Sequence, residues 1–129
     1  MLKTDFLQKK SACVNTVNML KNKMTVYPGG KKKEYYSLVD GKFHGLYEMW
    51  YPSGQKKCEI MYDHGIKNGF LRIWYESGQM QFEIPYVNGK VHGFWRKWYE
   101  NGTIETEVSY IHGEEKFMLE IDGKPRMFT

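Results

Sequence analysis

The chain has 129 residues, of which 16% are aromatic and 13 are glycine, and its net charge is +4. This length predicts one domain, and the longest apolar runs fall far short of the ~18 residues that a membrane-spanning helix needs. Two cysteines, Cys13 and Cys58, are too few for a disulfide framework and have no metal-ligand spacing. We therefore expect a reduced, intracellular protein of the cytoplasm.

Charge is distributed unevenly along the chain. Residues 1–33 hold eight lysines and one aspartate, a net charge of +7, whereas residues 34–129 hold eight lysines, three arginines and 14 acidic residues, a net charge of −3. This asymmetry predicts a basic N-terminal arm on a mildly acidic body.

Apolar residues in the N-terminal segment have helical spacing. Cys13, Val17, Leu20 and Met24 follow one another at i, i+4, i+7 and i+11, which predicts an amphipathic helix over about residues 4–24. We assign residues 1–25 to this basic helix and expect it to cap the first hairpin or one sheet face. The alternatives are docking to an anionic membrane surface, which is not favoured, or to an acidic partner or nucleic acid.

From residue 26 onward the sequence repeats with a period of 24 residues. Three series of glycines and two aromatic columns keep this period. The glycine series are Gly41, Gly65, Gly89 and Gly113; Gly45, Gly69 and Gly93; and Gly30, Gly54, Gly78 and Gly102. The aromatic columns are Trp50, Trp74 and Trp98, and Tyr27, Tyr51, Tyr75 and Tyr99.

Each repeat has the pattern of a β-hairpin with two different turns. One turn is Asp40-Gly41, His64-Gly65, Asn88-Gly89 and His112-Gly113. Its first residue belongs to the types that best tolerate positive φ, and a following Gly predicts a type I′ turn. The other turn is Gly29-Gly30, Ser53-Gly54, Ser77-Gly78 and Asn101-Gly102. The segments between them alternate with period two, which predicts strands.

The first strand of each repeat carries large apolar side chains on both faces. Phe70 and Trp74 point one way, and Leu71, Ile73 and Tyr75 point the other way. Either these side chains brace a thin single-layer sheet, or one aromatic face docks a partner. For the second interpretation the candidate contact residues are Tyr47, Tyr51, Tyr75, Trp95 and Tyr99, with the Trp column serving structure; Arg72 and Arg96 are expected to stack on the Trp rings.

The repeat resembles the MORN repeat, in the variant of bacterial and giant-virus proteins. The pattern Gly-x-x-x-Gly-x-x-x-x-Trp-Tyr-x-x-Gly is complete three times. Its structural residues are Gly41, Gly45, Trp50 and Gly54; Gly65, Gly69, Trp74 and Gly78; and Gly89, Gly93, Trp98 and Gly102. The resemblance implies a mostly β, elongated, single-layer antiparallel meander of stacked hairpins. Its parts are a half repeat at 26–40, full repeats at 41–64, 65–88 and 89–112, and a shortened C-terminal hairpin cap at 113–129.

No arrangement of residues predicts catalysis, a cofactor or a metal site. His44 and His92, like His64 and His112, lie two repeats apart, or ~20 Å, too far to share a metal ion. His44 and His64 come from successive loops, but no third ligand is evident, so we interpret the histidines as turn residues. We expect the column Glu59, Glu83 and Glu107 to pair across strands with Arg72 and Arg96.

The leading hypothesis is therefore a non-enzymatic protein-binding or structural scaffold module. By resemblance it is a component of a virion or assembly, or alternatively a bacterial antitoxin or immunity protein that neutralises a partner toxin. Anionic-membrane docking through the basic N-terminal arm is the third hypothesis. Nucleic acid is not an expected partner, because the repeat region is net negative.

Overall fold

A computed structural model of the chain describes residues 20–120 and 125–127, which form one 12-stranded sheet. The strands are β1 (Leu20–Val26), β2 (Lys32–Val39), β3 (Lys42–Phe43), β4 (Gly45–Trp50), β5 (Lys56–Asp63), β6 (Ile66–Trp74), β7 (Met80–Val87), β8 (Lys90–Val91), β9 (Gly93–Trp98), β10 (Ile104–Ile111), β11 (Glu114–Glu120) and β12 (Pro125–Met127).

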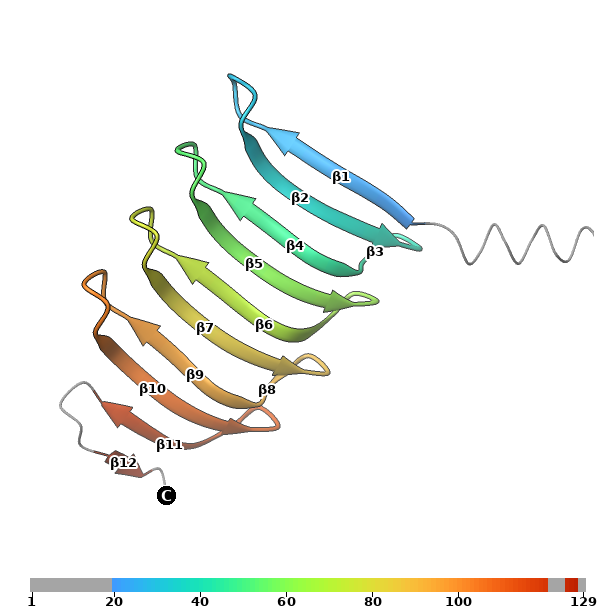
Figure 1. Cartoon of the computed structure of the whole chain (residues 1–129). Coiled ribbons are helices and arrows are strands. Elements are labelled where there is room, and N and C mark those ends of the chain that lie inside the picture. Colours follow the sequence, from blue (N-terminus) through green and yellow to red (C-terminus); the bar gives the residue numbers. More distant parts are fainter. Residues whose placement is uncertain (1–19, 121–124, 128–129) are drawn as a thin grey trace, which may run out of the picture.

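The sheet is a meander in which consecutive strands are neighbours. Its order is β1-β2-β4-β5-β6-β7-β9-β10-β11-β12, and every pair is antiparallel (Figure 1). The short strands β3 and β8 pair with β2 and β7, and a single residue, His44 or His92, separates each from β4 or β9. The expected mostly β, antiparallel meander of stacked hairpins is confirmed.

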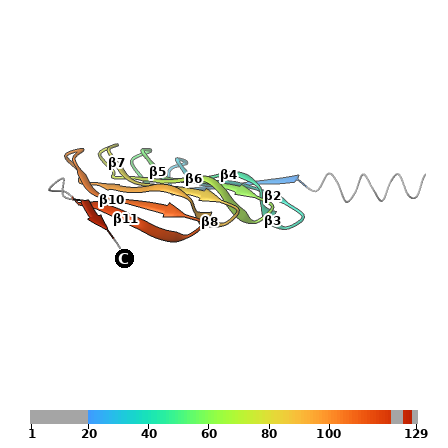
Figure 2. The same ribbon diagram turned by 90° about the horizontal axis from the view of Figure 1, so that it is seen from below.

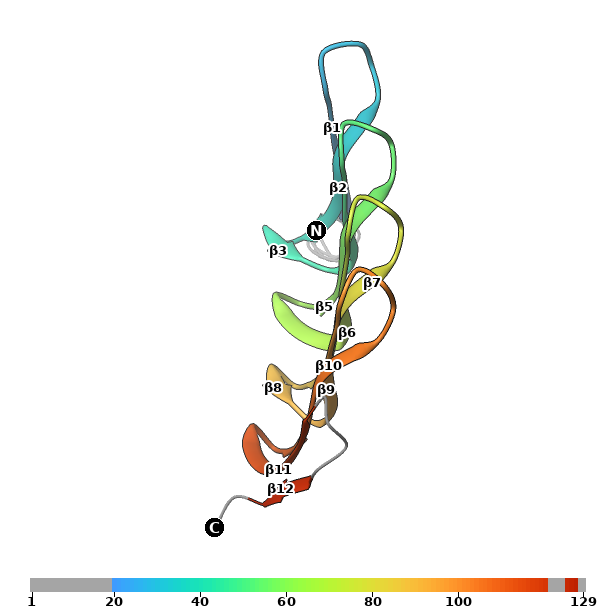
Figure 3. The same cartoon turned by 90° about the vertical axis from the view of Figure 1, so that its left-hand side faces the viewer.

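The sheet is one layer thick over the described residues. Seen from below it is a thin band, and in the edge-on view the two ends of the hairpins curl toward opposite faces (Figures 2 and 3). Val108, at 3% exposure, is the one buried hydrophobic residue among the side chains that the structure describes. A sheet with no second layer cannot bury its side chains behind another element, so contacts between neighbouring hairpins must hold it together.

The predicted N-terminal helix is wrong for its last residues. Residues 20–24 belong to β1, which pairs with β2 from Leu20 opposite Val39 to Val26 opposite Lys32; residues 1–19 lie outside the described part of the chain. Leu20 and Met24 fit both a helical and a two-residue period, because they are four residues apart. The pairing with β2 shows that these residues form a strand and not a helix. Strands β1 and β2 together make an additional hairpin before the first full repeat.

The turn prediction is confirmed. Both central residues of each short turn have positive φ: Asp40 and Gly41 at 51° and 76°, His64 and Gly65 at 46° and 85°, Asn88 and Gly89 at 48° and 81°, and His112 and Gly113 at 50° and 83°. Positive φ at both positions defines the type I′ turn, whose twist matches that of the flanking strands.

The second turn is a three-residue loop that ends on a glycine. In the first full repeat the amide of Gly54 donates to the carbonyl of Tyr51 at 2.9 Å, and the amide of Tyr51 donates to the carbonyl of Gln55 at 2.8 Å. Gly54 has a φ of 94°, and the strand register shifts between Met49 and Trp50, shortly before the loop. The other copies repeat this geometry, with amide–carbonyl distances between 2.8 and 2.9 Å. The register shift, a β-bulge, recurs beside Trp74 and Trp98, the last residues of their strands.

The type I′ geometry makes Gly89→Val a direct test of the fold. A Cβ atom at Gly89 would lie 3.3 Å from Cγ2 of Ile66, and a β-branched residue is strained at a φ of 81°. We expect the free energy of unfolding to fall by more than about 1 kcal/mol, measured by urea unfolding. The control Asn88→Gly should keep its stability, because glycine adopts positive φ freely. An unchanged midpoint for Gly89→Val would contradict this description of the turn.

Candidate interaction surfaces

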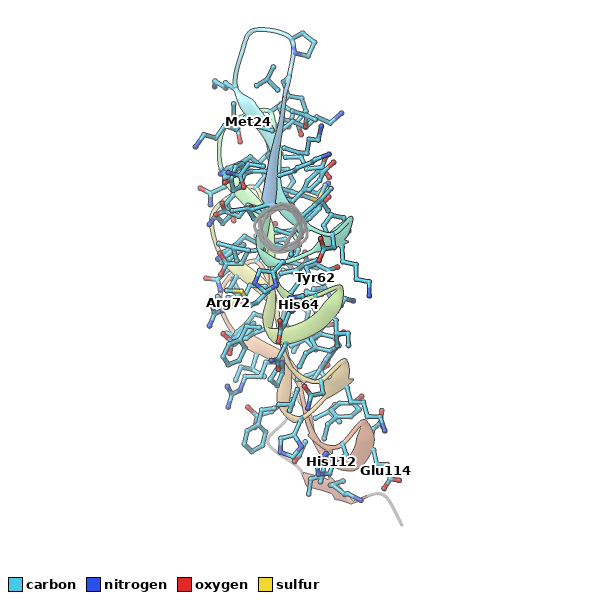
Figure 4. All side chains as sticks on the ribbon, turned by 90° about the vertical axis from the view of Figure 1, so that its right-hand side faces the viewer. Met24, Tyr62, His64, Arg72, His112 and Glu114 are labelled. Carbon is cyan, nitrogen blue, oxygen red and sulfur yellow. The ribbon has the colours of Figure 1, made fainter. Side chains whose placement is uncertain are left out.

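Residues opposite one another on neighbouring strands divide the sheet into two faces. One row of cross-strand partners is Glu48, Glu59, Arg72, Glu83, Arg96 and Glu107, and we call its side the charged face. The opposite side, the aromatic face, carries Tyr47, Ile60, Leu71 and Ile84 in one row and the partners Trp95 and Val108. Figure 4 shows side chains on both sides of the ribbon, with Arg72 on one side and Tyr62 on the other.

On the charged face, carboxylates and cations form a continuous ladder. Arg72 contacts Glu83 at 2.9 Å and Glu59 at 3.2 Å, and Arg96 contacts Glu107 at 2.6 Å and Glu83 at 3.8 Å. Lys56 extends the ladder by bridging Glu59 at 3.1 Å and Glu48 at 2.6 Å. The predicted cross-strand pairing of Arg72 and Arg96 with the Glu column is confirmed. Hydrogen bonds to Glu83 and Glu59 raise the pKa of Arg72 above its ordinary value.

Beside this ladder lies a row of exposed apolar side chains. Phe70, Phe94 and Met61 are 42%, 41% and 39% exposed. The guanidinium of Arg72 lies 4.5 Å from the Phe70 ring centroid, and that of Arg96 lies 5.1 Å from the Phe94 centroid. The expected stacking of these arginines on the Trp rings is therefore wrong: the Phe lies two residues before the Arg on the same strand, whereas a bulge separates Arg72 from Trp74. We call Met61, Phe70, Arg72, Phe94 and Arg96 the Phe–Arg stripe.

Rings on the aromatic face pack against one another. Phe43 lies between Tyr36, Tyr47 and Tyr62, with centroid distances of 5.1 to 5.3 Å, and Tyr47 stacks on Tyr36 at 5.6 Å. The hydroxyl of Tyr47 donates to Glu34, and burial followed by this hydrogen bond raises the pKa of Tyr47 above its usual range. Trp95 lies half-buried with its ring 5.6 Å from that of Phe82. The candidate residues Tyr47 and Trp95 thus contact their own sheet.

The turns that carry the histidines lie in a row at one end of the strands, and we call this end of the hairpins the histidine edge (Figure 4). The amide of His64 donates to Nδ1 of His44, and the amide of His112 donates to Nδ1 of His92, both at 3.2 Å. Between them the amide of Asn88 donates to Oδ1 of Asn68 at 3.4 Å. One side chain therefore caps the next turn in each case, and the prediction that His64 and His112 are turn residues is confirmed by their positive φ.

Asp63 lies beside the first histidine pair and was not among the candidate residues predicted from the sequence. Its Oδ1 lies 2.6 Å from Nδ1 of His64 and 3.6 Å from Nδ1 of His44. The sequence does contain a signal for it, namely that Asp63 departs from its repeat column: the residues one period before and after it are Val39 and Val87.

The sequence pattern of the MORN repeat variant matches this chain at residues 43–64, 68–88 and 91–112, about half of its length. The chain belongs to the MORN repeat variant family. MORN repeats are generally non-catalytic modules and typically mediate protein or membrane interactions. No curated protein and no solved structure matches the chain. Within the described residues, no helix has the length and apolar character to cross a membrane.

The Tyr column couples one MORN repeat to the next. The hydroxyls of Tyr27, Tyr51 and Tyr75 donate to the backbone carbonyls of Trp50, Trp74 and Trp98, at 2.8, 2.7 and 2.8 Å. Tyr51 and Tyr75, predicted from the sequence as partner-contact residues, therefore form structural hydrogen bonds within the sheet. Tyr99 is 38% exposed, and the position one period after Trp98 is Asp122, outside the described residues.

Removing one of these hydroxyls tests the coupling. We expect Tyr75→Phe to lower the free energy of unfolding by about 1 kcal/mol, because it deletes a partly buried hydrogen bond and leaves the Trp98 carbonyl without its donor. Tyr62→Phe is the matched control, since the tyrosine hydroxyls that form hydrogen bonds within the described residues are those of Tyr27, Tyr47, Tyr51, Tyr75 and Tyr110. Urea unfolding measures both variants; equal stabilities would show that the hydroxyl ladder contributes nothing.

A second variant tests the charged ladder. Arg72→Leu leaves the carboxylates of Glu59 and Glu83 without their shared cation, and all three side chains are at most one-third exposed. We expect a loss of about 1 kcal/mol at low salt, shrinking at roughly 1 M NaCl because ions screen the repulsion. Lys116→Leu removes the exposed Lys116–Glu114 pair and should leave stability unchanged. A loss independent of salt would assign Arg72 a packing role.

Proposed function

We propose that this chain is a non-enzymatic protein-binding scaffold that docks its partner on the Phe–Arg stripe of the charged face. The observation that supports this most directly is the exposure of Phe70 and Phe94, at 42% and 41%, on an open single-layer surface. Burying such side chains against a partner removes apolar area that the sheet itself cannot cover.

The composition of the Phe–Arg stripe supports a protein partner. Aromatic residues, methionine and arginine are the types enriched at the centres of protein interfaces. Each stripe arginine is held by carboxylates, Arg72 by Glu59 and Glu83, so its position is set before binding and less conformational freedom is lost on docking. The repeats place these side chains on successive hairpins, which favours an extended partner surface.

Charge favours a protein over an anionic membrane as the occupant of the sheet. The region from residue 34 onward is net negative, and the ladder already neutralises its own arginines. An anionic membrane would attract the lysine-rich segment instead, which includes the exposed Lys21, Lys23 and Lys31.

The state of the described chemical groups is also consistent with a non-catalytic module. The ladder carboxylates are paired with cations, so they do not form the closely spaced acid and base of a hydrolase. Burial raises the pKa of the Cys58 thiol, which keeps it protonated and a poor nucleophile at neutral pH. The two finer roles implied by resemblance, an assembly component and a toxin-neutralising protein, share this docking mode and differ in the partner.

Affinity capture from the native source with matched variants tests the docking surface. We expect Phe70→Ser combined with Phe94→Ser to remain folded and to weaken capture of the specific partner at least about tenfold, as for hot-spot residues. Ile66→Ser combined with Ile111→Ser deletes side chains of similar exposure, 52% and 46%, in the strands at the type I′ turns and should leave capture intact. Mass spectrometry then identifies the partner as a structural component or a toxin.

Two outcomes would contradict the proposal. If the Phe pair binds as well as the wild type while Tyr99→Ala loses the partner, the docking surface includes Tyr99 as the sequence analysis proposed. If no partner is captured and the chain sediments with anionic vesicles, the membrane hypothesis replaces the protein scaffold.

A further inference from the structure

We propose that His44, Asp63 and His64 form a binding site for a divalent transition-metal ion of the Zn²⁺ type at the histidine edge. Each side chain offers one ligand atom, and the three atoms all lie within 4.8 Å of one another. Two imidazoles and one carboxylate, with water in the fourth position, are a common ligand set for Zn²⁺.

The geometry needs only small side-chain rotations to hold such an ion. With metal–ligand bonds of about 2.0–2.2 Å, two ligands of a tetrahedral ion are ~3.4 Å apart. The carboxylate Oδ1 of Asp63 is 3.6 Å from Nδ1 of His44 and 2.6 Å from Nδ1 of His64. Exposures of 38%, 58% and 64% for His44, Asp63 and His64 leave room for these rotations and give water access to the site.

Proton positions favour a ligand role for His44. Its Nδ1 accepts the backbone N–H of His64 at 3.2 Å, so this nitrogen carries the lone pair rather than the proton. The same nitrogen faces Asp63. The imidazole is therefore in the tautomer that a metal ligand through Nδ1 needs, and a bound ion would take the place of the 3.2 Å amide contact.

Asp63 is the residue that the fold does not explain. The repeat-equivalent positions are Val39, Val87 and Ile111, all aliphatic ends of their strands. Turn capping accounts for the pairs His44–His64, Asn68–Asn88 and His92–His112, which share one hydrogen bond. Capping gives no reason for a carboxylate at residue 63. A metal ion does, because the carboxylate is placed only where two histidines already meet.

The chain contains its own matched control. The rings of His92 and His112 lie 4.8 Å apart, compared with 4.4 Å for His44 and His64, and both pairs have the same 3.2 Å amide contact. The residue beside the second pair is Ile111 instead of an acid. The two pairs differ chiefly in this carboxylate.

Calorimetric titration of the full chain with Zn²⁺ at neutral pH tests the site, with Co²⁺ absorbance as a second readout of coordination. We expect one Zn²⁺ per chain for the wild type. Asp63→Val and His64→Asn introduce the residues found one repeat later, at Val87 and Asn88, so both variants should fold. Each should weaken Zn²⁺ affinity at least about tenfold, the loss typical even of outer-sphere partners.

His112→Asn makes the same exchange in the second pair and should leave Zn²⁺ affinity within about twofold, a difference too small to report a lost ligand. Ile111→Asp should create a second Zn²⁺ site. The proposal is overturned if the wild type does not bind, or if Asp63→Val and His64→Asn bind as the wild type does. An equal loss for His112→Asn, or one Zn²⁺ for Ile111→Asp, would show that the carboxylate does not complete the site.

Discussion

The hydrogen bond that Tyr27, Tyr51 and Tyr75 each donate to the Trp carbonyl of the next repeat is the interaction on which this sheet most depends. A single layer has almost no interior, and Val108 is the one buried hydrophobic residue in the described chain whose side chain is placed. Each hairpin must therefore be stabilised by the hairpins beside it. The donors Tyr27, Tyr51 and Tyr75 reach the Trp carbonyl of the next repeat to do so, and the turn caps at the histidine edge repeat the principle at the opposite ends of the hairpins.

This dependence on neighbours explains why both faces carry large side chains. On the charged face, Arg72 and Arg96 each bind carboxylates on two neighbouring strands. On the aromatic face, rings such as Phe43 and Tyr47 pack within the layer at 5.3 Å. The bracing interpretation accounts for the half-buried rings of the aromatic face. It accounts less well for Phe70 and Phe94, which stay more than two-fifths exposed under their arginines, and these are the side chains that we assign to a partner.

Most of the fold could be predicted from the sequence because its signals are local. A residue such as Asn88 before Gly89 specifies the turn, and strand alternation then fixes which side chains share a face. Prediction failed where a local pattern was ambiguous or where the deciding contact was distant. Leu20 and Met24 fit a helix as well as a strand until β2 supplied a partner. For Tyr51 the sequence did not reveal a structural contact, because its hydroxyl acceptor is the backbone carbonyl of Trp74, 23 residues away; its role in partner contact stays a prediction.

The candidate metal site shows a different limit of sequence reasoning. In a repeat protein the fold makes the same demand at each equivalent position, so a residue type that serves the fold should recur. Lys67 occupies the position of Phe43 one repeat later, and both side chains pack on the Tyr of their own repeat. The ammonium of Lys67 lies 5.0 Å from the ring centroid of Tyr86, and the ring centroid of Phe43 lies 5.1 Å from that of Tyr62. Asp63 meets no such demand, since an aliphatic residue ends the corresponding strand in every other described repeat. Its position beside two imidazoles is therefore better explained by a bound metal ion than by the packing of the repeats.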